Sequence, residues 1–266
     1  MIVIKLKGGL GNQMFQYAYG RNLMLTKKKK VVFDISFFAF DKYDTVTKRD
    51  FLLKKFNIPL EINFESKQEK FYIKFIKKVL KKIGFTFEEY FQSEKYFKNI
   101  KDIIQNEFTL KTPLSPKAIE WKEKINLLDN SISVHIRRTD YINNSTNQKI
   151  YTVCDQKYYK NAVLLIKEKL TNQVVNFFIF SDDIEWVKQN LKFENAKYVS
   201  DSNLSECEEL ILMSYCKHNI IANSTFSWWG AWLNKNKDKI VISPKNWFLD
   251  AKSNKNDIVP ETWIKL

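Results

Sequence analysis

The sequence predicts an α/β protein built from two doubly wound lobes, residues 1–128 and 129–266. Apolar runs of strand length alternate with helical patterns along the chain, which is typical of parallel sheets whose strands are joined by helices. The alternation starts anew near residue 128, which indicates two lobes with a cleft between them. A length of 266 residues and a composition that is 44% hydrophobic and 15% aromatic allow a packed core in each lobe.

The first lobe opens as a β-α-β unit. The pattern predicts a strand, a glycine turn with a helix, and a second strand, at residues 2–6, 12–27 and 30–35. Residues 41–66 show no clear period. The segment 67–82 has the pattern of a basic amphipathic helix, with apolar residues on one side and lysines largely on the other.

The second lobe repeats the alternation after TPLSP, whose two prolines interrupt the pattern at 112–116, and a further short helix. Its predicted strands have the sequences SISVHI, VVNFFIF, KYVSD, HNII and KIVISP. Helices are predicted at 155–170, after SDD, at about 205–217 and in STFSWWGAWLN. The extreme C-terminus is assigned to this lobe, with packing back on the first lobe as an alternative.

Charge restricts the partners of the chain. Its 44 basic and 30 acidic residues give a net charge of +14, which favours polyanions, phosphorylated ligands or an anionic membrane face. Only four of the basic residues are arginines, and two of them, Arg137 and Arg138, are adjacent. A guanidinium grips phosphate bidentately, which a lysine cannot do. The paired arginines therefore indicate a phosphate site.

Other compositional signals indicate a cytoplasmic protein. The three cysteines show no metal-ligand spacing, and their odd number predicts no disulfide framework. No apolar stretch has the form of a secretion signal or the length of a membrane span. The basic face of 67–82 could still dock on the inner face of an anionic membrane, although an ordinary solvated helix would have the same pattern.

The opening turn, KGGLGNQM, allows three interpretations. It contains the spaced glycines and downstream acid of a dinucleotide-binding fingerprint, here Gly9, Gly11 and Asp34. Met14, however, stands where that fingerprint needs a small residue. The glycines could instead simply permit a tight turn. In the third interpretation, the turn lets a substrate approach the backbone while Asn12 and Gln13 point their amides into the cleft.

The motif HIRRTD stands where a buried strand ends, the edge at which ligands of parallel sheets bind. Strand alternation puts Arg137 on the same side as His135, with Arg138 opposite. Arg137 is therefore predicted to bind phosphate. For Arg138, a salt bridge with a nearby acid such as Asp140 is an equal alternative.

The motif NSTFSWWGAW supplies a matching anion site. Its small hydroxyl residues open a helix whose N–H groups and dipole attract phosphate oxygens. The alternative is ordinary N-capping by Ser224 or Thr225. The tryptophans are predicted to pack in the core, namely Trp228, Trp229 and Trp232.

The acids of SDD, residues 181–183, follow a strand and could hold a divalent cation. Helix capping is favoured, with Ser181 or Asp182 as the cap and Asp183 at the positive end of the helix. No metal site is predicted, because Arg137 and a helix terminus already provide positive charge for phosphates.

Taken together and in this order, GGLGNQMFQYA, HIRRTDY, SDD and NSTFSWWGAWLN closely resemble bacterial alpha-1,2-fucosyltransferases of glycosyltransferase family 11. The resemblance implies a GT-B arrangement of two Rossmann-like domains, GDP-fucose as the donor, and inversion at the fucose carbon without a metal or other cofactor. The implied acceptor is the 2-hydroxyl of a galactose in a surface polysaccharide or an oligosaccharide, free or lipid-linked.

The resemblance also assigns the site. The donor would bind in the second lobe, on His135, Arg137, Arg138, Asp182, Ser224, Thr225 and Ser227. The opening turn would face the acceptor through Gly9, Gly11, Asn12 and Gln13. Arg137 would stabilise the departing diphosphate, and Asn12 and Asp140 are the other catalytic candidates.

A carboxylate is expected to take the proton of the attacking hydroxyl. Asp140 is the first candidate because it follows the arginine pair, and Asp34 and Asp155 come next. Two neighbouring arginines would lower the pKa of Asp140, which makes a stable anion but a weak base.

Two other functions are weighed against this one. An NAD-dependent oxidoreductase would use Gly9, Gly11 and Asp34, and a basic nucleic-acid-binding module would use the lysines. Neither explains why two arginines pair at a strand end. No nucleic-acid partner is predicted, because the lysine-rich segment carries its aromatic residues on the apolar side.

Overall fold

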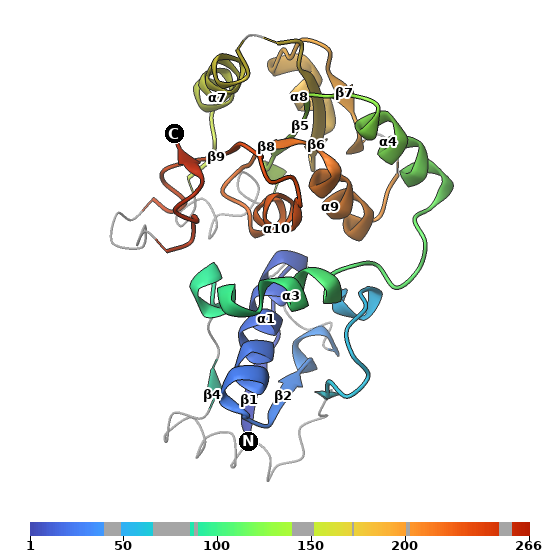
Figure 1. Cartoon of the computed structure of the whole chain (residues 1–266), viewed down its shortest axis with the longest axis vertical. Helices are drawn as coiled ribbons and strands as arrows, with labels where there is room; N and C mark the ends of the chain where they lie inside the picture. Colours follow the sequence, from blue (N-terminus) through green and yellow to red (C-terminus); the bar gives the residue numbers. More distant parts are fainter. Residues whose placement is uncertain are drawn as a thin grey trace. The chain divides into compact units, whose positions relative to one another are not determined.

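The computed structural model describes residues 1–39, 49–65, 86–87, 90–139, 152–171, 173–200, 203–249 and 257–266. The chain divides into two compact units, Met1–Thr112 and Pro113–Leu266 (Figure 1). Each unit has its own parallel sheet, which confirms the α/β class predicted from the alternating pattern. The basic segment 67–82 lies outside the described residues.

The first unit is built on a four-stranded parallel sheet of order β3-β2-β1-β4. Its strands are β1 (Ile2–Lys5), β2 (Val31–Asp34), β3 (Phe64–Glu65) and β4 (Thr86–Phe87). Counted along the chain, this order is 3-2-1-4, which matches the first four strands of the Rossmann order. The direction of the strand order reverses between β1 and β4, and a ligand site is expected there.

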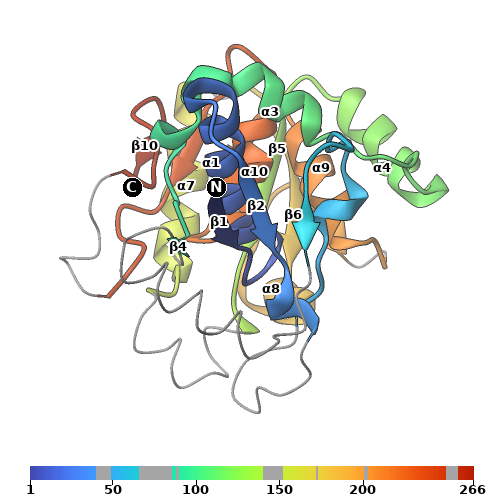
Figure 2. The ribbon, with the colours of Figure 1, turned by 90° about the horizontal axis from the view of Figure 1, so that it is seen from below.

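Helix α1 (Leu10–Lys27) connects β1 to β2 and runs beside them (Figure 2). It begins two residues earlier than predicted. Gly20 lets the helix approach the sheet closely, because an added Cβ would lie 2.6 Å from the Phe33 ring and 2.8 Å from Ile4 Cδ1. Lys28 ends the helix in the left-handed conformation, with φ of 48°.

Shorter helices complete the described part of the first unit: η1 (Ser36–Ala39), η2 (Leu53–Lys55), η3 (Glu94–Tyr96), η4 (Lys98–Ile100) and α3 (Lys101–Glu107). The buried Glu107 ties α3 to α1. Its two carboxylate oxygens accept a hydrogen bond from the Tyr17 hydroxyl at 2.7 Å and pair with Arg21 Nε at 2.8 Å. With both oxygens occupied, the buried charge is compensated.

The second unit is built on a six-stranded parallel sheet of order β10-β9-β8-β5-β6-β7. Its strands are β5 (Ser131–Ile136), β6 (Asn176–Ser181), β7 (Lys197–Tyr198), β8 (His218–Ile220), β9 (Val241–Ser243) and β10 (Ile264–Lys265). Counted along the chain, the order is 3-2-1-4-5-6, the full Rossmann order. The direction of the strand order reverses between β5 and β8, which are neighbours in the sheet with Ile132 opposite His218.

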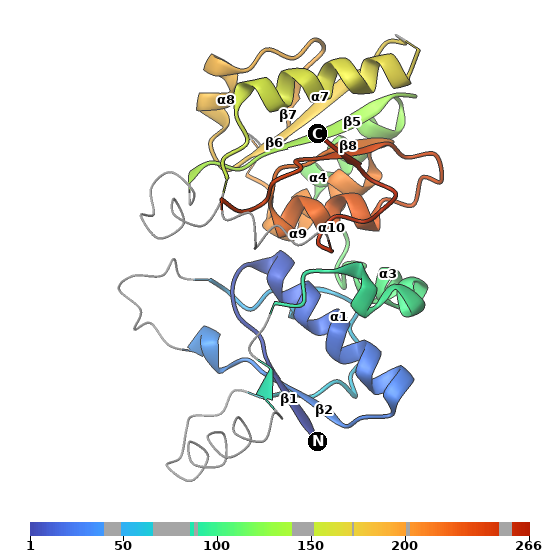
Figure 3. The same ribbon diagram turned by 90° about the vertical axis from the view of Figure 1, so that its left-hand side faces the viewer.

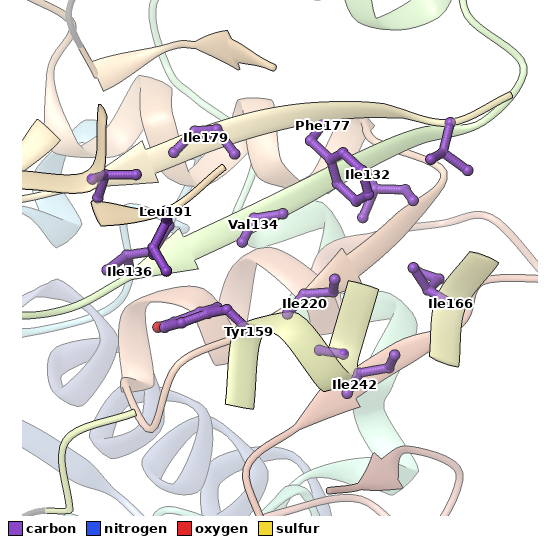
Figure 4. Packing of buried hydrophobic residues seen from close by; sticks show 13 residues of the cluster. Ile132, Val134, Ile136, Tyr159, Ile166, Phe177, Ile179, Leu191, Ile220 and Ile242 are labelled. Carbon is purple, nitrogen blue, oxygen red and sulfur yellow. The ribbon is translucent and has the colours of Figure 1, made fainter. Parts of the chain in front are cut away.

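Both faces of this sheet are buried, so its strands read as nearly continuous apolar runs. Helix α7 (Gln156–Lys169) covers one face, and the close-up in Figure 4 shows Tyr159 and Ile166 packed near Val134 and Ile220. Helices α4 (Pro116–Asn126) and α9 (Glu206–Tyr215) pack on the other face against Phe178. Figure 3 shows α7 and α9 on opposite sides of β5 and β6.

The remaining helices follow the two strands that matter most for the site. Helix α8 (Ile184–Asn190) comes after β6, and α10 (Thr225–Leu233) comes after β8. The three α10 tryptophans are almost fully buried, and Trp228 Nε1 donates a hydrogen bond to the Ile258 carbonyl at 2.6 Å. The prediction that these tryptophans pack in the core is confirmed.

The boundary between the two units differs from the sequence prediction. The units meet at Thr112 and Pro113, within TPLSP, instead of after residue 128. The reason is α4, whose Ala118 and Ile125 belong to the core of the second unit, and whose N-cap Ser115 donates its backbone N–H to Glu208 Oε1 at 2.8 Å. The C-terminus belongs to the second unit, as assigned from the sequence, because β10 pairs in parallel with β9. Within the described residues, no helix has the length and apolarity to cross a membrane.

The close approach at Gly20 makes a stability prediction. Gly20→Ala should lower the free energy of unfolding by about 1–2 kcal/mol, because the clash with buried Phe33 and Ile4 outweighs the ~1 kcal/mol that alanine gains in a helix. Urea unfolding of the full chain measures the change. Leu25→Ala, on the exposed part of α1, is the control and should change stability less. A Gly20→Ala protein as stable as the wild type would show that α1 can move away from the sheet at little cost.

Candidate active site

The candidate site of the second unit lies where its strand order reverses, beyond the carboxyl ends of β5 and β8. The residues after β5 begin with Arg137, and those after β8 lead through Asn223 into α10. Side chains at the two ends are close, since the His135 ring centre lies 5.6 Å from that of Phe226 in the first turn of α10. The topology thus brings together the described part of HIRRTD, residues 135–139, and NSTFS.

Asp182, the first residue after β6, holds the backbone that follows β5. Its Oδ1 accepts a hydrogen bond from the Arg138 N–H at 2.9 Å, and its Oδ2 accepts one from the Thr139 N–H at 3.1 Å and another from the Thr139 hydroxyl. The same Oδ2 lies 3.2 Å from Arg137 Nη1. Asp182 was predicted to bind the donor substrate directly. Its contacts show instead that its carboxylate positions Arg137.

Electrostatics keep Asp182 ionised. Burial acts to raise the pKa of its carboxyl, but the charge of Arg137 and the hydrogen bonds from Thr139 and Arg138 outweigh burial and hold the pKa below its usual value. The Arg137 side chain keeps 22% of its surface exposed. An arginine fixed by an anion and still reachable from solvent is suited to bind a second anion.

Arg138 lies against α8. Its Nε is 3.3 Å from Asp183 Oδ2, and its guanidinium carbon is 3.3 Å from the centre of the Trp186 ring. This is the salt-bridge alternative, with Asp183 as the partner; Asp140 lies outside the described residues. Asp183 is also the N-cap of α8 and accepts from the Trp186 N–H, so the prediction that Ser181 or Asp182 caps this helix is wrong.

His135 is a buried, neutral imidazole. Only 4% of the residue is exposed, and burial lowers the pKa of the ring to about 3, with Asp182 opposing this shift and Arg137 adding to it. Its Nδ1 is buried and has no hydrogen-bond partner among the described residues. A buried polar atom of this kind, beside Arg137, is where a ligand group would complete the hydrogen bonding.

The start of α10 has the form expected of an anion site. Ser224 is the N-cap, but no side chain of the described residues makes the capping hydrogen bond, so the capping alternative is not observed. Ser227 differs from the prediction: its buried hydroxyl lies within hydrogen-bond reach of the carbonyls of Ala222 at 3.5 Å and Ser224 at 3.3 Å. It therefore shapes the turn, and Ser224 and Thr225 remain the candidates for direct contact.

Asn223 holds this turn in place, a role that the sequence did not predict for it. Its side-chain N–H groups donate to the carbonyls of Thr152 at 2.5 Å and Trp247 at 2.9 Å, while Cys154 Sγ donates to its oxygen at 3.6 Å. Two other segments, one containing Thr152 and Cys154 and one containing Trp247, thus contact this amide. The sequence does hint at this role: Asn223 stands between a buried strand and the start of a helix, where amide side chains often hydrogen-bond backbone groups.

The opening turn lies at the carboxyl end of β1, in the first unit. Gly8 has φ of +82°, a conformation that favours glycine, and an added Cβ there would lie 2.7 Å from Asn12 Nδ2. Gly9 is the N-cap of α1, and an added Cβ would meet no atom within 4 Å. Gly11 is a buried residue of the first helical turn, so it does not face an acceptor as predicted.

Asn12 and Gln13 have different roles. Asn12 Oδ1 accepts a hydrogen bond from Gln92 Nε2 at 2.9 Å, and Asn12 is partly exposed. Gln13 is fully buried: its Nε2 donates to the carbonyls of Gly8 and Asp50, and its Oε1 accepts from the Leu52 N–H. The prediction that Gln13 points into a cleft is therefore wrong, because backbone groups occupy its whole amide.

The three candidates for the catalytic base differ in what the structure shows of them. Asp140, the first choice, lies outside the described residues. Asp155 is the N-cap of α7 and accepts from the Tyr158 N–H at 2.7 Å, and the buried Asp34 accepts from the Ser36 N–H at 2.9 Å. Both thus have structural roles. Among the residues that the structure describes, no three His, Cys, Asp or Glu side chains gather as a metal site.

Glu209 of α9 is an unusual carboxyl near this site. Burial raises its pKa to about 7, the charges of Glu206 and Asp182 add to the rise, and the Ser200 hydroxyl opposes it. Ser200 Oγ in turn accepts from the Ser181 N–H at 3.0 Å, just before Asp182. The sequence does not single out Glu209, because it is one of three glutamates at the start of the same helix, with Glu206 and Glu208.

Comparison with known proteins identifies the family of this chain. The family model of glycosyl transferase family 11 matches residues 1–266. The O-antigen biosynthesis glycosyltransferase WbnK of Escherichia coli is 35% identical, over 98% of this chain and 99% of the relative. The alpha-1,2-colitosyltransferase of Escherichia coli is 33% identical, over 100% and 99%. A galactoside 2-alpha-L-fucosyltransferase of Caenorhabditis elegans is 28% identical, over 67% and 51%.

The raised pKa of Glu209 predicts a pH-dependent stability. A carboxyl whose pKa rises from 4.5 to about 7 on folding stabilises the folded state at low pH, and this contribution is lost as the pH rises through 7. Glu209→Gln should therefore gain melting temperature relative to the wild type between pH 6 and pH 8.5. Glu123→Gln, at an exposed position of α4, should show no such trend. A Glu209→Gln difference that stays constant over this range would contradict the raised pKa.

Proposed function

The chain belongs to glycosyl transferase family 11, and from this premise we propose that it transfers L-fucose from GDP-fucose to the 2-hydroxyl of a galactose in a glycan acceptor, with inversion. The observation that carries the donor assignment is Arg137, held by Asp182 beside the buried His135 at the reversal point of a Rossmann-ordered sheet. Nucleotides bind such points beyond the carboxyl ends of the strands.

In the proposed reaction, the acceptor oxygen bonds to the fucose C1 as the bond from C1 to the β-phosphate oxygen breaks, and GDP leaves with the electron pair. Negative charge therefore grows on the diphosphate in the transition state. The Arg137 guanidinium and the N–H groups at the start of α10 would stabilise this charge. Because these groups supply the positive charge, we expect transfer without a divalent cation.

The proton of the 2-hydroxyl must leave as the new bond forms, and we propose that a carboxylate accepts it. Asp140 remains the first candidate, since the structural roles of Asp34 and Asp155 disfavour both. In the first unit, Asn12 and the open backbone at Gly9 support the acceptor assignment of the opening turn.

Colitosyl transfer is a second candidate, because a relative that spans the whole chain is named an alpha-1,2-colitosyltransferase. Colitose is fucose without its 3-hydroxyl, so the two donors share the nucleotide and differ at one ring position. A site that hydrogen-bonds that hydroxyl rejects the donor that lacks it by a large factor. Comparing GDP-fucose with GDP-colitose as substrates distinguishes the two functions.

The two rival functions receive little support from the described residues. A dinucleotide would need a small residue at position 14, where the buried Met14 packs, and an available acid at position 34, where the buried Asp34 accepts from the Ser36 N–H. A nucleic-acid partner stays unsupported, and membrane attachment through 67–82 stays a prediction.

A thermal shift experiment tests the donor assignment without a known acceptor. GDP at a hundredfold excess over its dissociation constant should stabilise the fold by about 2.7 kcal/mol, whereas NAD and NADP should have no effect. The shift should persist in excess EDTA, because Arg137 and α10 replace the cation. Arg137→Ala should lose it, and Lys192→Ala, which removes an exposed positive charge from the same unit, should retain it.

Three results would count against the proposal. A shift with NAD and none with GDP would favour an oxidoreductase. A GDP shift that EDTA abolishes and magnesium restores would require a metal site. An unchanged GDP shift in Arg137→Ala would remove this residue from the donor site.

A further inference from the structure

The first unit carries a side-chain cluster that the sequence analysis did not assign. It lies at the reversal of the strand order between β1 and β4, where residues 6–9 follow one strand and Tyr90 and Gln92 lie shortly after the other. Two contacts join these segments. Gln92 Nε2 donates to Asn12 Oδ1 at 2.9 Å, and Lys7 Nζ lies 4.8 Å from the centre of the Tyr90 ring.

The backbone between Tyr90 and Gln92 is held in a costly conformation. Phe91 has φ of +52°, which a bulky residue rarely adopts and which costs on the order of 1–3 kcal/mol. Its ring is buried and stacks on Tyr19 with centres 3.9 Å apart, and it meets Tyr96 edge to face at 5.7 Å. Ser93 adds a hydrogen bond from its N–H to the Phe91 carbonyl at 2.8 Å.

The two neighbours of the buried Phe91, by contrast, are partly exposed to solvent. Tyr90 stays 38% exposed although Lys7 lies over its ring, and Gln92 is partly exposed. Beside them, an added Cβ on Gly9 would meet no atom within 4 Å, so the backbone there is accessible. The buried Gln13, which bonds the Gly8 carbonyl, keeps the turn in place.

The cluster has the chemistry of a carbohydrate site. A partly exposed aromatic ring offers an apolar surface, and two side-chain amides offer both donors and acceptors to neutral hydroxyls. A ring beside a few well-placed polar groups is the usual composition of a small-molecule site. An anion is less suited, because Lys7, the cation that contacts this cluster among the described residues, lies over the Tyr90 ring.

We propose that Tyr90 and the Asn12–Gln92 amide pair bind the acceptor sugar, with the Tyr90 ring against the apolar face of the galactose and the amides on its hydroxyls. The proposal rests on the proposed function and names the residues of its acceptor site. Gln92 has a double role, since its hydrogen bond also fixes the orientation of the Asn12 amide.

Steady-state kinetics with lactose as the acceptor and GDP-fucose as the donor test this assignment. Tyr90→Ala should lower kcat/KM for lactose about tenfold or more, mainly through KM, whereas Tyr90→Phe keeps the ring and should retain most of the activity. Gln92→Ala should lower kcat as well as raise KM for lactose, because it also frees Asn12. Leu60→Ala removes a side chain that is 93% exposed in the same unit and is the matched control.

The GDP-induced thermal shift distinguishes a failure of the acceptor-site assignment from a failure of the proposed function, because it reports the donor site alone. Variants that lose lactose transfer and keep the wild-type GDP shift would support the assignment. A Tyr90→Ala enzyme with a wild-type KM for lactose would overturn it while the proposed function stands. A wild-type protein that shows no GDP shift and no transfer to lactose would overturn the proposed function, and this assignment with it.

Discussion

The candidate donor site depends on one carboxylate. Asp182 stands at the end of β6, yet all of its described contacts reach the residues that follow β5: two backbone N–H groups, the Thr139 hydroxyl and the Arg137 guanidinium. These contacts fix both the path of the backbone and the side chain at its start. An arginine on a loop would otherwise lose about 2 kcal/mol of rotamer freedom when it binds an anion. Holding it in advance lowers that cost for the diphosphate.

Topology explains why the functional residues gather as they do. Both sheets begin with the strand order 3-2-1-4, so each unit has a reversal point at the carboxyl ends of two strands. In the second unit, charged and buried polar groups gather there, with Arg137 and His135 on one strand end and α10 on the other. In the first unit, the same place holds neutral amides and an aromatic ring. The same topological feature thus positions both the proposed donor site and the proposed acceptor site.

The sequence predicted the long elements and the second-unit motifs, because strand and helix periods are visible over ten or more residues and buried parallel strands end at a common edge. It did not reveal β3, β4 or β10, because two residues are too few to show a period; the equally short β7 was predicted only within the longer run KYVSD. The hydrogen-bond partners of individual side chains were harder to predict. Gln13 and Ser227 carry polar groups suited to a ligand, and only the folded backbone shows that carbonyls and N–H groups occupy them.

Asp182 is proposed to act on the donor through Arg137, and a double-mutant cycle on GDP binding tests this role most directly. Calorimetry would give the GDP dissociation constant for the wild type, Arg137→Ala, Asp182→Asn and the double variant. We expect each single change to weaken binding about tenfold or more, and the double variant to bind no worse than Arg137→Ala, because the two residues act as one unit. Losses that add in full, or an Asp182→Asn protein with wild-type affinity, would contradict the account.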